Sequence, residues 1–162
     1  MPAVLARAVA AMLSSGLQHE EDAVRIHVAR QTVAWAHCDA AGRVFYPNFY
    51  VWFDQATERL FRANGLSYAE LSREFGVVGI PLVETGARYV NACQLGDDVD
   101  MRTWVEEWSQ RSFLVKHVIT HADGRPAVEG FERRVWAVLD PASPKGLRAI
   151  QIPEQAMARF VD

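Results

Sequence analysis

The chain has 162 residues, a formal net charge of −3 and an isoelectric point near 5.9. A chain of this length fits one domain that can bury its own core. Half of the residues are hydrophobic and 23% are charged, which is the balance of a folded globular protein and excludes a disordered one. Because nucleic-acid-binding proteins usually carry a basic patch or stripe, the slightly acidic charge argues against a nucleic-acid partner.

The first residues differ in character from the rest of the chain. An alanine-rich apolar run from Met1 to Leu17 is too short to span a bilayer. Arg7 interrupts the uniform apolar stretch that a secretory signal peptide needs. We therefore expect residues 1–22 to be a helical or disordered extension, and residues 23–162 to form a single domain.

The cysteines indicate the cellular compartment. Cys38 and Cys93 are the only two in the sequence, and they have neither metal-ligand spacing nor the framework of a disulfide-rich secreted domain. We expect a cytoplasmic protein that has no metal site and no membrane partner.

The predicted domain begins with a strand and a loop. Apolar residues alternate with other residues over 24–29, which is the period-two pattern of a half-buried strand. Residues 37–42 are small or polar and end in a glycine, so the strand should give way to a loop there. Catalytic residues often lie in such loops.

One long amphipathic helix follows. Pro47 suits its first position because the missing N–H costs nothing there, and Gly65 after Asn64 marks its other end. Between these ends, apolar residues recur at helical spacing: Phe49, Phe53, Ala56, Leu60 and Phe61. A second, short helix is predicted over residues 67–75.

The second half of the chain is predicted to be mainly β. Four segments are rich in valine, threonine and aromatic residues: 82–93, 99–109, 112–120 and 127–139. Their separators are short enough for antiparallel connections, and a loop over 140–146 precedes a short terminal helix over 153–160. Since a twisted antiparallel sheet can wrap around one amphipathic helix, we predict an α+β fold of about five strands around one long central helix.

One segment, residues 37–50, reads HCDAAGRVFYPNFY. It resembles the signature of the 4-hydroxybenzoyl-CoA thioesterase family, which has an acidic residue, a small residue, Asp-Pro-Ala-Gly, an apolar pair and Tyr-Pro-Asn-Tyr. Shorter segments also correspond, and they extend the resemblance over residues 24–160: 76–83, 107–108, 111–113 and 147–150. Two residues depart from the signature. His37 stands in place of the acidic residue and Ala40 in place of the proline, which makes the loop less rigid.

The resemblance implies a hot-dog fold and an acyl-CoA thioesterase that hydrolyses a small acyl- or aryl-CoA. It also implies that two subunits pair through their sheets, often within a tetramer, with the active sites at the subunit interface. No cofactor is implied, because coenzyme A is part of the substrate.

Asp39 and Tyr46 are the predicted catalytic residues. Thioester hydrolysis needs an oxyanion donor and either a nucleophile or a base for water, and one carboxylate can serve as either of these. Asp39 matches the aspartate of the signature, although a lone aspartate in a loop is more often a cap. The helix N-terminus that follows can polarise the carbonyl. Since Pro47 has no N–H to donate, the Tyr46 N–H is the predicted donor, unless Tyr46 only starts the helix.

Further residues are predicted to bind the substrate. The resemblance points to the turn Ser109-Gln110-Arg111-Ser112 as the site for the nucleotide of coenzyme A. Only Arg111 is charged there, so a solvated hairpin remains the alternative. Tyr50, Tyr68 and Ile80 are predicted to contact the acyl group. Ile80 replaces a hydroxyl-bearing residue of the relatives, which predicts a less polar pocket.

Other interpretations of single residues are weaker. His37 could contact Asp39 as in a hot-dog dehydratase, and Cys38 could be a nucleophile, but a lone histidine or a free cysteine is commonly structural. His117 and His121 face alike on one strand, yet they do not make a metal site. The main competing function is a hot-dog module that binds acyl-CoA without turning it over.

Overall fold

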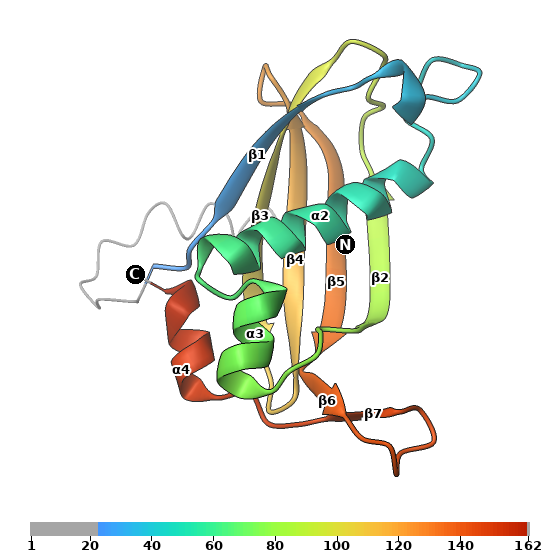
Figure 1. The fold of residues 1–162 in the computed structure, drawn as a ribbon. Coiled ribbons are helices and arrows are strands. Elements are labelled where there is room, and N and C mark those ends of the chain that lie inside the picture. The colour runs from blue at the N-terminus through green and yellow to red at the C-terminus, as the bar shows by residue number, and fades with distance from the viewer. Residues whose placement is uncertain (1–22, 162) are drawn as a thin grey trace, which may run out of the picture.

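The structure, a computed structural model, describes residues 23–161, so the predicted extension over 1–22 lies outside the described residues. Five strands form one antiparallel sheet in the order β1-β3-β4-β5-β2. These are β1 (His27–Thr32), β2 (Leu82–Tyr89), β3 (Asp98–Trp108), β4 (Ser112–His121) and β5 (Pro126–Val135). The sheet curves around the long helix α2 (Pro47–Ala63) (Figure 1). The predicted α+β architecture is confirmed.

Smaller elements lie at the ends of the sheet. They are η1 (Trp35–His37), α3 (Tyr68–Phe75), the paired short strands β6 (Ala137–Leu139) and β7 (Leu147–Ala149), α4 (Glu154–Met157) and η2 (Ala158–Phe160). Within residues 23–161, no helix is long and apolar enough to cross a membrane.

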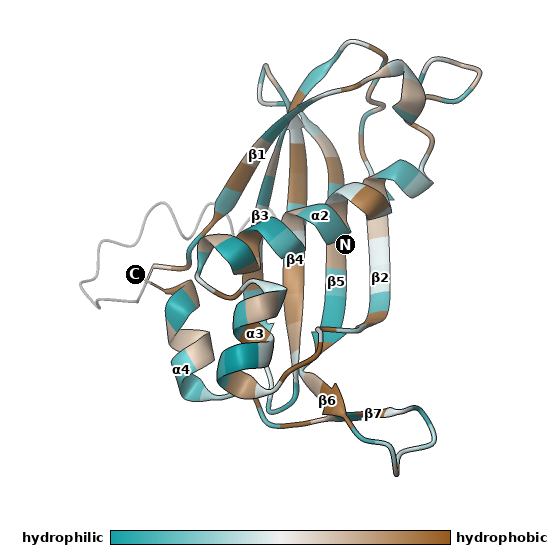
Figure 2. Cartoon of the chain, in the orientation of Figure 1, coloured by the Kyte–Doolittle hydropathy of each residue, from teal (hydrophilic) through white to brown (hydrophobic). Residues whose placement is uncertain are grey.

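The apolar stripe of α2 is buried against the sheet, while hydrophilic residues cover its outer side (Figure 2). The buried residues are Phe49, Trp52, Phe53, Ala56, Thr57, Leu60 and Phe61. The helix approaches β5 closely at Gly130, where any Cβ would collide with the ring of Phe53. That ring also stacks on His117, with 4.5 Å between the ring centroids. Glycine at position 130 therefore sets the distance between α2 and the sheet.

Several predicted strand boundaries are wrong. The first strand begins at His27 rather than at residue 24, because Val24 makes only an isolated bridge to Val161. The strand predicted to reach residue 93 ends at Tyr89, after which two successive N–H groups donate to the Ala127 carbonyl and turn the chain away.

The strand predicted over 127–139 is two strands. Trp136 separates β5 from β6, and its backbone leaves the five-stranded sheet. Its N–H donates to the Arg111 carbonyl, and its own carbonyl accepts from the Ile150 N–H. The strand β7, which pairs with β6 just before Ile150, was not predicted because it is only three residues long.

A carboxylate lies in the core between α2 and β5. Glu132 is 2% exposed and accepts a 2.6 Å hydrogen bond from the Thr57 hydroxyl and two hydrogen bonds from Arg134. His117 Nε2 lies 3.5 Å from its Oε2. Burial alone would raise the pKa of Glu132, but the contacts with His117, Arg134 and Thr57 outweigh burial and hold the pKa at about 2.

We expect Glu132 to make the fold sensitive to acid. Its folded-state pKa of about 2 lies below the ordinary value of 4.5, so its stabilisation is complete above about pH 4.5 and disappears as the pH falls toward 2. The free energy of unfolding should fall by roughly 2 kcal/mol between pH 6 and pH 3, and by roughly 3 kcal/mol by pH 2. Urea unfolding of the wild type and Glu132→Gln at pH 6 and pH 3 measures this. An equal loss in both proteins would exclude Glu132 as the source.

Candidate active site

Asp39 lies in a tight turn between β1 and α2. Its backbone N–H donates to the Arg43 carbonyl, and its carbonyl accepts from the Gly42 N–H. Gly42 has a φ of 71°, a left-handed conformation that glycine adopts without strain. Asp39 Oδ1 accepts from the Ala41 N–H at 2.8 Å and the Arg43 N–H at 3.3 Å. Oδ1 therefore holds the turn together, as the capping interpretation expects.

The second carboxylate oxygen of Asp39 has a different environment. Asp39 is exposed, and within residues 23–161 no donor binds Oδ2. One side chain thus combines a fixed oxygen with a free one. The turn orients the carboxylate through Oδ1, and Oδ2 remains available to a carbonyl carbon or a water molecule.

The start of α2 is tied to this turn. The His37 carbonyl accepts from the Phe45 N–H at 2.8 Å and from Asn48 Nδ2 at 2.9 Å. Asn48 therefore links the helix to the residue two positions before Asp39. Sequence reasoning assigned Asn48 only to the signature and missed this role.

Tyr46 occupies the N-cap position of α2, and Pro47 follows at the first helical position. No group in residues 23–161 accepts the Tyr46 N–H, whereas the N–H groups of Asn48 and Phe49 donate to the carbonyls of Phe45 and Tyr46. An unpaired N–H at a helix N-terminus is suited to stabilise an oxyanion, because the helix dipole adds to it.

The turn that contains Asp39 is hydrogen-bonded to the segment that leads into β3. The Val44 N–H donates to the Cys93 carbonyl, and the Leu95 N–H donates to the Gly42 carbonyl. Burial, together with the Asp97 carboxylate, raises the pKa of the Cys93 thiol to about 11. Cys93 is therefore a protonated core residue, and it contributes packing rather than chemistry.

The side chain of His37 does not contact Asp39. Its Nδ1 accepts a 3.0 Å hydrogen bond from the Ala34 N–H, and its ring meets Trp52 edge-on with 5.1 Å between centroids. The histidine thus closes η1.

The two histidines of β4 have different partners. His117 contacts Thr103 and Glu132, His121 lies 3.6 Å from Asp97, and the described residues contain no metal-ligand cluster.

The structure brings together two of the three predicted acyl-contacting residues. Tyr68 and Ile80 line one crevice with Glu58, Phe61, Leu66, Ser67 and Leu71, but this crevice has no room for a water molecule. Tyr50 lies elsewhere on α2, next to Tyr89 at the end of β2. Burial, the hydrogen bond with Tyr50, and the nearby Tyr50 and Tyr46 raise the pKa of Tyr89 to about 12.

The predicted nucleotide-binding turn lies far from Asp39. Residues 109–112 form the hairpin between β3 and β4, closed by the Ser109 N–H donating to the Ser112 carbonyl. The turn that contains Asp39 is hydrogen-bonded through Gly42 to Leu95, three residues before β3 begins. The two sites are thus separated by the 11 residues of β3, or about 35 Å of extended strand. The site residues do not converge within one chain.

Comparisons with known proteins agree with the signature. Residues 33–160 match the profile of a protein family described as the "Thioesterase-like superfamily". The 4-hydroxybenzoyl-CoA thioesterase of Pseudomonas sp. strain CBS-3 is 31% identical over 129 residues, which cover 76% of this chain and 89% of that protein. The 1,4-dihydroxy-2-naphthoyl-CoA hydrolase of Picosynechococcus sp. is 29% identical over 90 residues, 56% of this chain and 61% of that protein.

Solved structures give the same result. A mutant 4-hydroxybenzoyl CoA thioesterase complexed with 4-hydroxybenzoyl CoA superposes with a TM-score of 0.76 at 29% identity, covering 84% of this chain and 99% of that one. A gentisyl-coenzyme A thioesterase superposes with a TM-score of 0.67 at 30% identity, over 83% and 98% of the two chains. This chain therefore has the hot-dog fold and belongs to the thioesterase-like superfamily that includes the 4-hydroxybenzoyl-CoA thioesterases.

Proposed function

We propose that this protein hydrolyses the thioester bond of a small acyl- or aryl-CoA to a free acid and coenzyme A. The observation that carries the proposal is the free Oδ2 of Asp39 in a turn tied to the N-terminus of α2, where the Tyr46 N–H is unpaired. The named activities of the relatives, all of them CoA thioester hydrolases, support the same reaction class.

Two mechanisms use this arrangement. Asp39 could attack the thioester carbonyl and expel the coenzyme A thiolate, forming a mixed anhydride that water then hydrolyses. Alternatively, Asp39 removes a proton from water, and the resulting hydroxide attacks the same carbon. In both, the Tyr46 N–H stabilises the negative charge on the carbonyl oxygen, and the leaving thiolate takes up a proton.

We propose that two copies of the chain complete each site. No strand among residues 23–161 pairs with the outer edge of β2. Its end at Tyr89 lies near the start of α2, through the contact between the rings of Tyr89 and Phe49. Antiparallel pairing of β2 with a second copy would reverse one chain relative to the other. It would bring the Asp39 end of one chain toward the Arg111 end of its partner.

This pairing also accounts for the narrow crevice beside Ile80. Within one chain the crevice has no room for a water molecule, so the proposed acyl site needs a wall from a second copy. The exposed apolar residues on the β2 edge are suited to such an interface; they include Leu82, Val83 and Tyr89. A homodimer, or a tetramer of two such dimers, in the cytoplasm is the proposed assembly.

Arg111 is the proposed phosphate contact. We expect Arg111→Ala to raise the KM for acyl-CoA about tenfold with a smaller change in kcat, because a contact remote from the carbonyl contributes mainly uniform binding. Steady-state kinetics with acyl-CoA and the matching acyl-pantetheine measure this. Arg102→Ala, an exposed arginine in the middle of β3, is the control. Equal losses on both substrates would show that Arg111 does not bind the nucleotide.

The side chains that line the proposed acyl pocket predict which acyl groups the protein prefers. Ile80 is 3% exposed and has no side-chain hydroxyl, so we expect benzoyl-, butyryl- or hexanoyl-CoA to be hydrolysed at least as well as 4-hydroxybenzoyl-CoA. An unpaired substrate hydroxyl costs about 1–3 kcal/mol. Values of kcat/KM across these four substrates test the expectation. A preference above about a hundredfold for 4-hydroxybenzoyl-CoA would contradict it.

A binding module without turnover is the second candidate, because Asp39 also has a structural role as the cap of its turn. A thiol-release assay together with calorimetry separates the two functions. Tight binding of an acyl-CoA with no release of thiol from any acyl-CoA would favour the module.

A further inference from the structure

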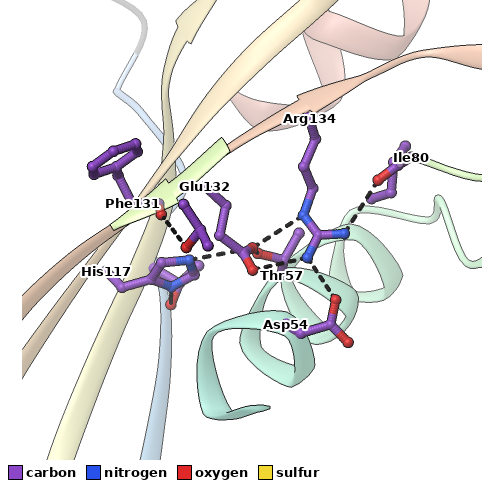
Figure 3. Close-up of polar contacts among 9 residues, drawn as sticks. Asp54, Thr57, Ile80, His117, Phe131, Glu132 and Arg134 are labelled. Carbon is purple, nitrogen blue, oxygen red and sulfur yellow. Dashed lines mark hydrogen bonds and ion pairs between the residues drawn. The ribbon is translucent and has the colours of Figure 1, made fainter. Parts of the chain in front are cut away.

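A buried arginine on β5 connects that strand to α2 and to the segment that contains Ile80 (Figure 3). Arg134, on the face of β5 that packs against α2, is 4% exposed. Its guanidinium donates to both carboxylate oxygens of Glu132, at 3.0 and 2.9 Å. Nη2 also donates to Asp54 Oδ1 on α2 at 2.6 Å, and Nη1 donates to the Ile80 carbonyl at 3.2 Å.

The two outer partners of Arg134 lie on different elements. Asp54 projects from the exposed side of α2, with 66% of its side chain exposed. Ile80 lies in the segment between α3 and β2 and lines the same crevice as Tyr68 and Glu58. The phenol of Tyr68 also lies within the electrostatic reach of Arg134, Asp54 and Glu58. Arg134 therefore joins α2 to the segment that forms the wall of the crevice.

The buried ion pair between Glu132 and Arg134 is better explained by geometry than by stability. Burying an ion pair gives little net stability, and apolar residues of similar volume often serve the fold as well or better. A cluster of apolar side chains packs against the C-terminal half of α2, and it includes Leu60, Phe61 and Phe113. What the ion pair adds is geometry, because a planar guanidinium that makes four directed hydrogen bonds permits only one separation of its partners.

We propose that Arg134, held by Glu132, is a positioning residue that sets the separation of α2 from the Ile80 segment and thereby the selectivity for the acyl group. The inference rests on the proposed thioesterase function. Arg134 itself touches no reacting atom. Its effect is to hold the Ile80 wall of the proposed acyl site at a fixed distance from α2 of the same chain.

The test uses a double variant, Glu132→Gln with Arg134→Met. This pair removes the ion pair and leaves no buried charge unpaired, and glutamine keeps an oxygen for the Thr57 hydroxyl, so the variant should fold. The readout is the ratio of kcat/KM for benzoyl-CoA to that for hexanoyl-CoA. We expect this ratio to change at least about tenfold from its wild-type value, while the inhibition constant of free coenzyme A stays unchanged.

Two further variants make the result specific. Asp54→Asn removes the charge of the exposed partner without touching the core, and it should shift the ratio in the same direction by a smaller factor. Arg133→Gln is the matched control, because Arg133 lies on the opposite face of β5, where it pairs with Glu84 at 3.8 Å. It should leave the ratio as in the wild type.

A merely structural role gives a different outcome. The variants would then lower the melting temperature or slow both substrates equally, and an unchanged ratio in Asp54→Asn and in a folded double variant would overturn the inference. If the double variant does not fold, the ratio in Asp54→Asn decides alone. If the wild type hydrolyses neither substrate, the thioesterase function fails separately. The ratio of the two calorimetric dissociation constants then replaces kcat/KM.

Discussion

Asp39→Asn will lower kcat by at least about a hundredfold and leave the fold intact. The amide keeps an oxygen for the N–H groups of Ala41 and Arg43, which Asp39 Oδ1 binds in the wild type. The turn should therefore persist, whereas the negative charge needed for attack or for proton removal is lost. Thiol release at saturating acyl-CoA gives kcat, and thermal unfolding confirms that the variant is folded. Wild-type turnover in a folded variant would remove Asp39 from the mechanism.

The neighbouring cysteine provides the matched control. Cys38 Sγ donates to the Ala34 carbonyl at 3.5 Å, so its thiol faces the backbone of η1 and is not aligned with the free oxygen of Asp39. Cys38→Ala should keep most of the activity. A folded but inactive Cys38→Ala would instead support a thiol nucleophile.

The fold was predictable because its signals are local. The helix α2 has a proline at its start and a regular apolar stripe, and the strands have a period of two. The predicted strand boundaries were wrong where the chain leaves a regular element. At Trp136 the β pattern continues into residues 137–139 without a break, so the sequence contains no sign that the backbone changes its pairing partner there.

The candidate site could be located in the sequence for a similar reason. Asp39 and Tyr46 are seven residues apart, so one short motif contains both. The buried ion pair was not predicted, because a charged residue in an alternating strand is normally assigned to the solvent face. Glu132 and Arg134 occupy the inner face of β5, and their compensation comes from Thr57, Asp54 and the Ile80 carbonyl, which are distant in sequence.

Mixing two defective chains will restore activity if each site takes Asp39 from one copy and Arg111 from the other. Asp39→Asn subunits lack the carboxylate, and Arg111→Ala subunits bind substrate weakly at low concentration. In a mixed dimer, one site then combines both defects, but the other combines an intact Asp39 with an intact Arg111. Random pairing makes half of the dimers mixed with one intact site each, so we expect about a quarter of wild-type kcat/KM from the unfractionated mixture and about half from the purified mixed dimers.

The alternative, in which each chain supplies both residues of its own site, gives the opposite result. Every site in a mixed dimer then contains one defect, and activity cannot exceed that of the Arg111→Ala chains present. Co-expression with two different tags isolates the mixed dimers, and kcat/KM is measured far below KM, where the loss of Arg111 has its full effect. The 11 residues of β3 between the two sites favour restoration, because about 35 Å of strand exceeds the span of one pantetheine arm. Activity no higher than that of Arg111→Ala in the purified mixed dimers would contradict the shared site.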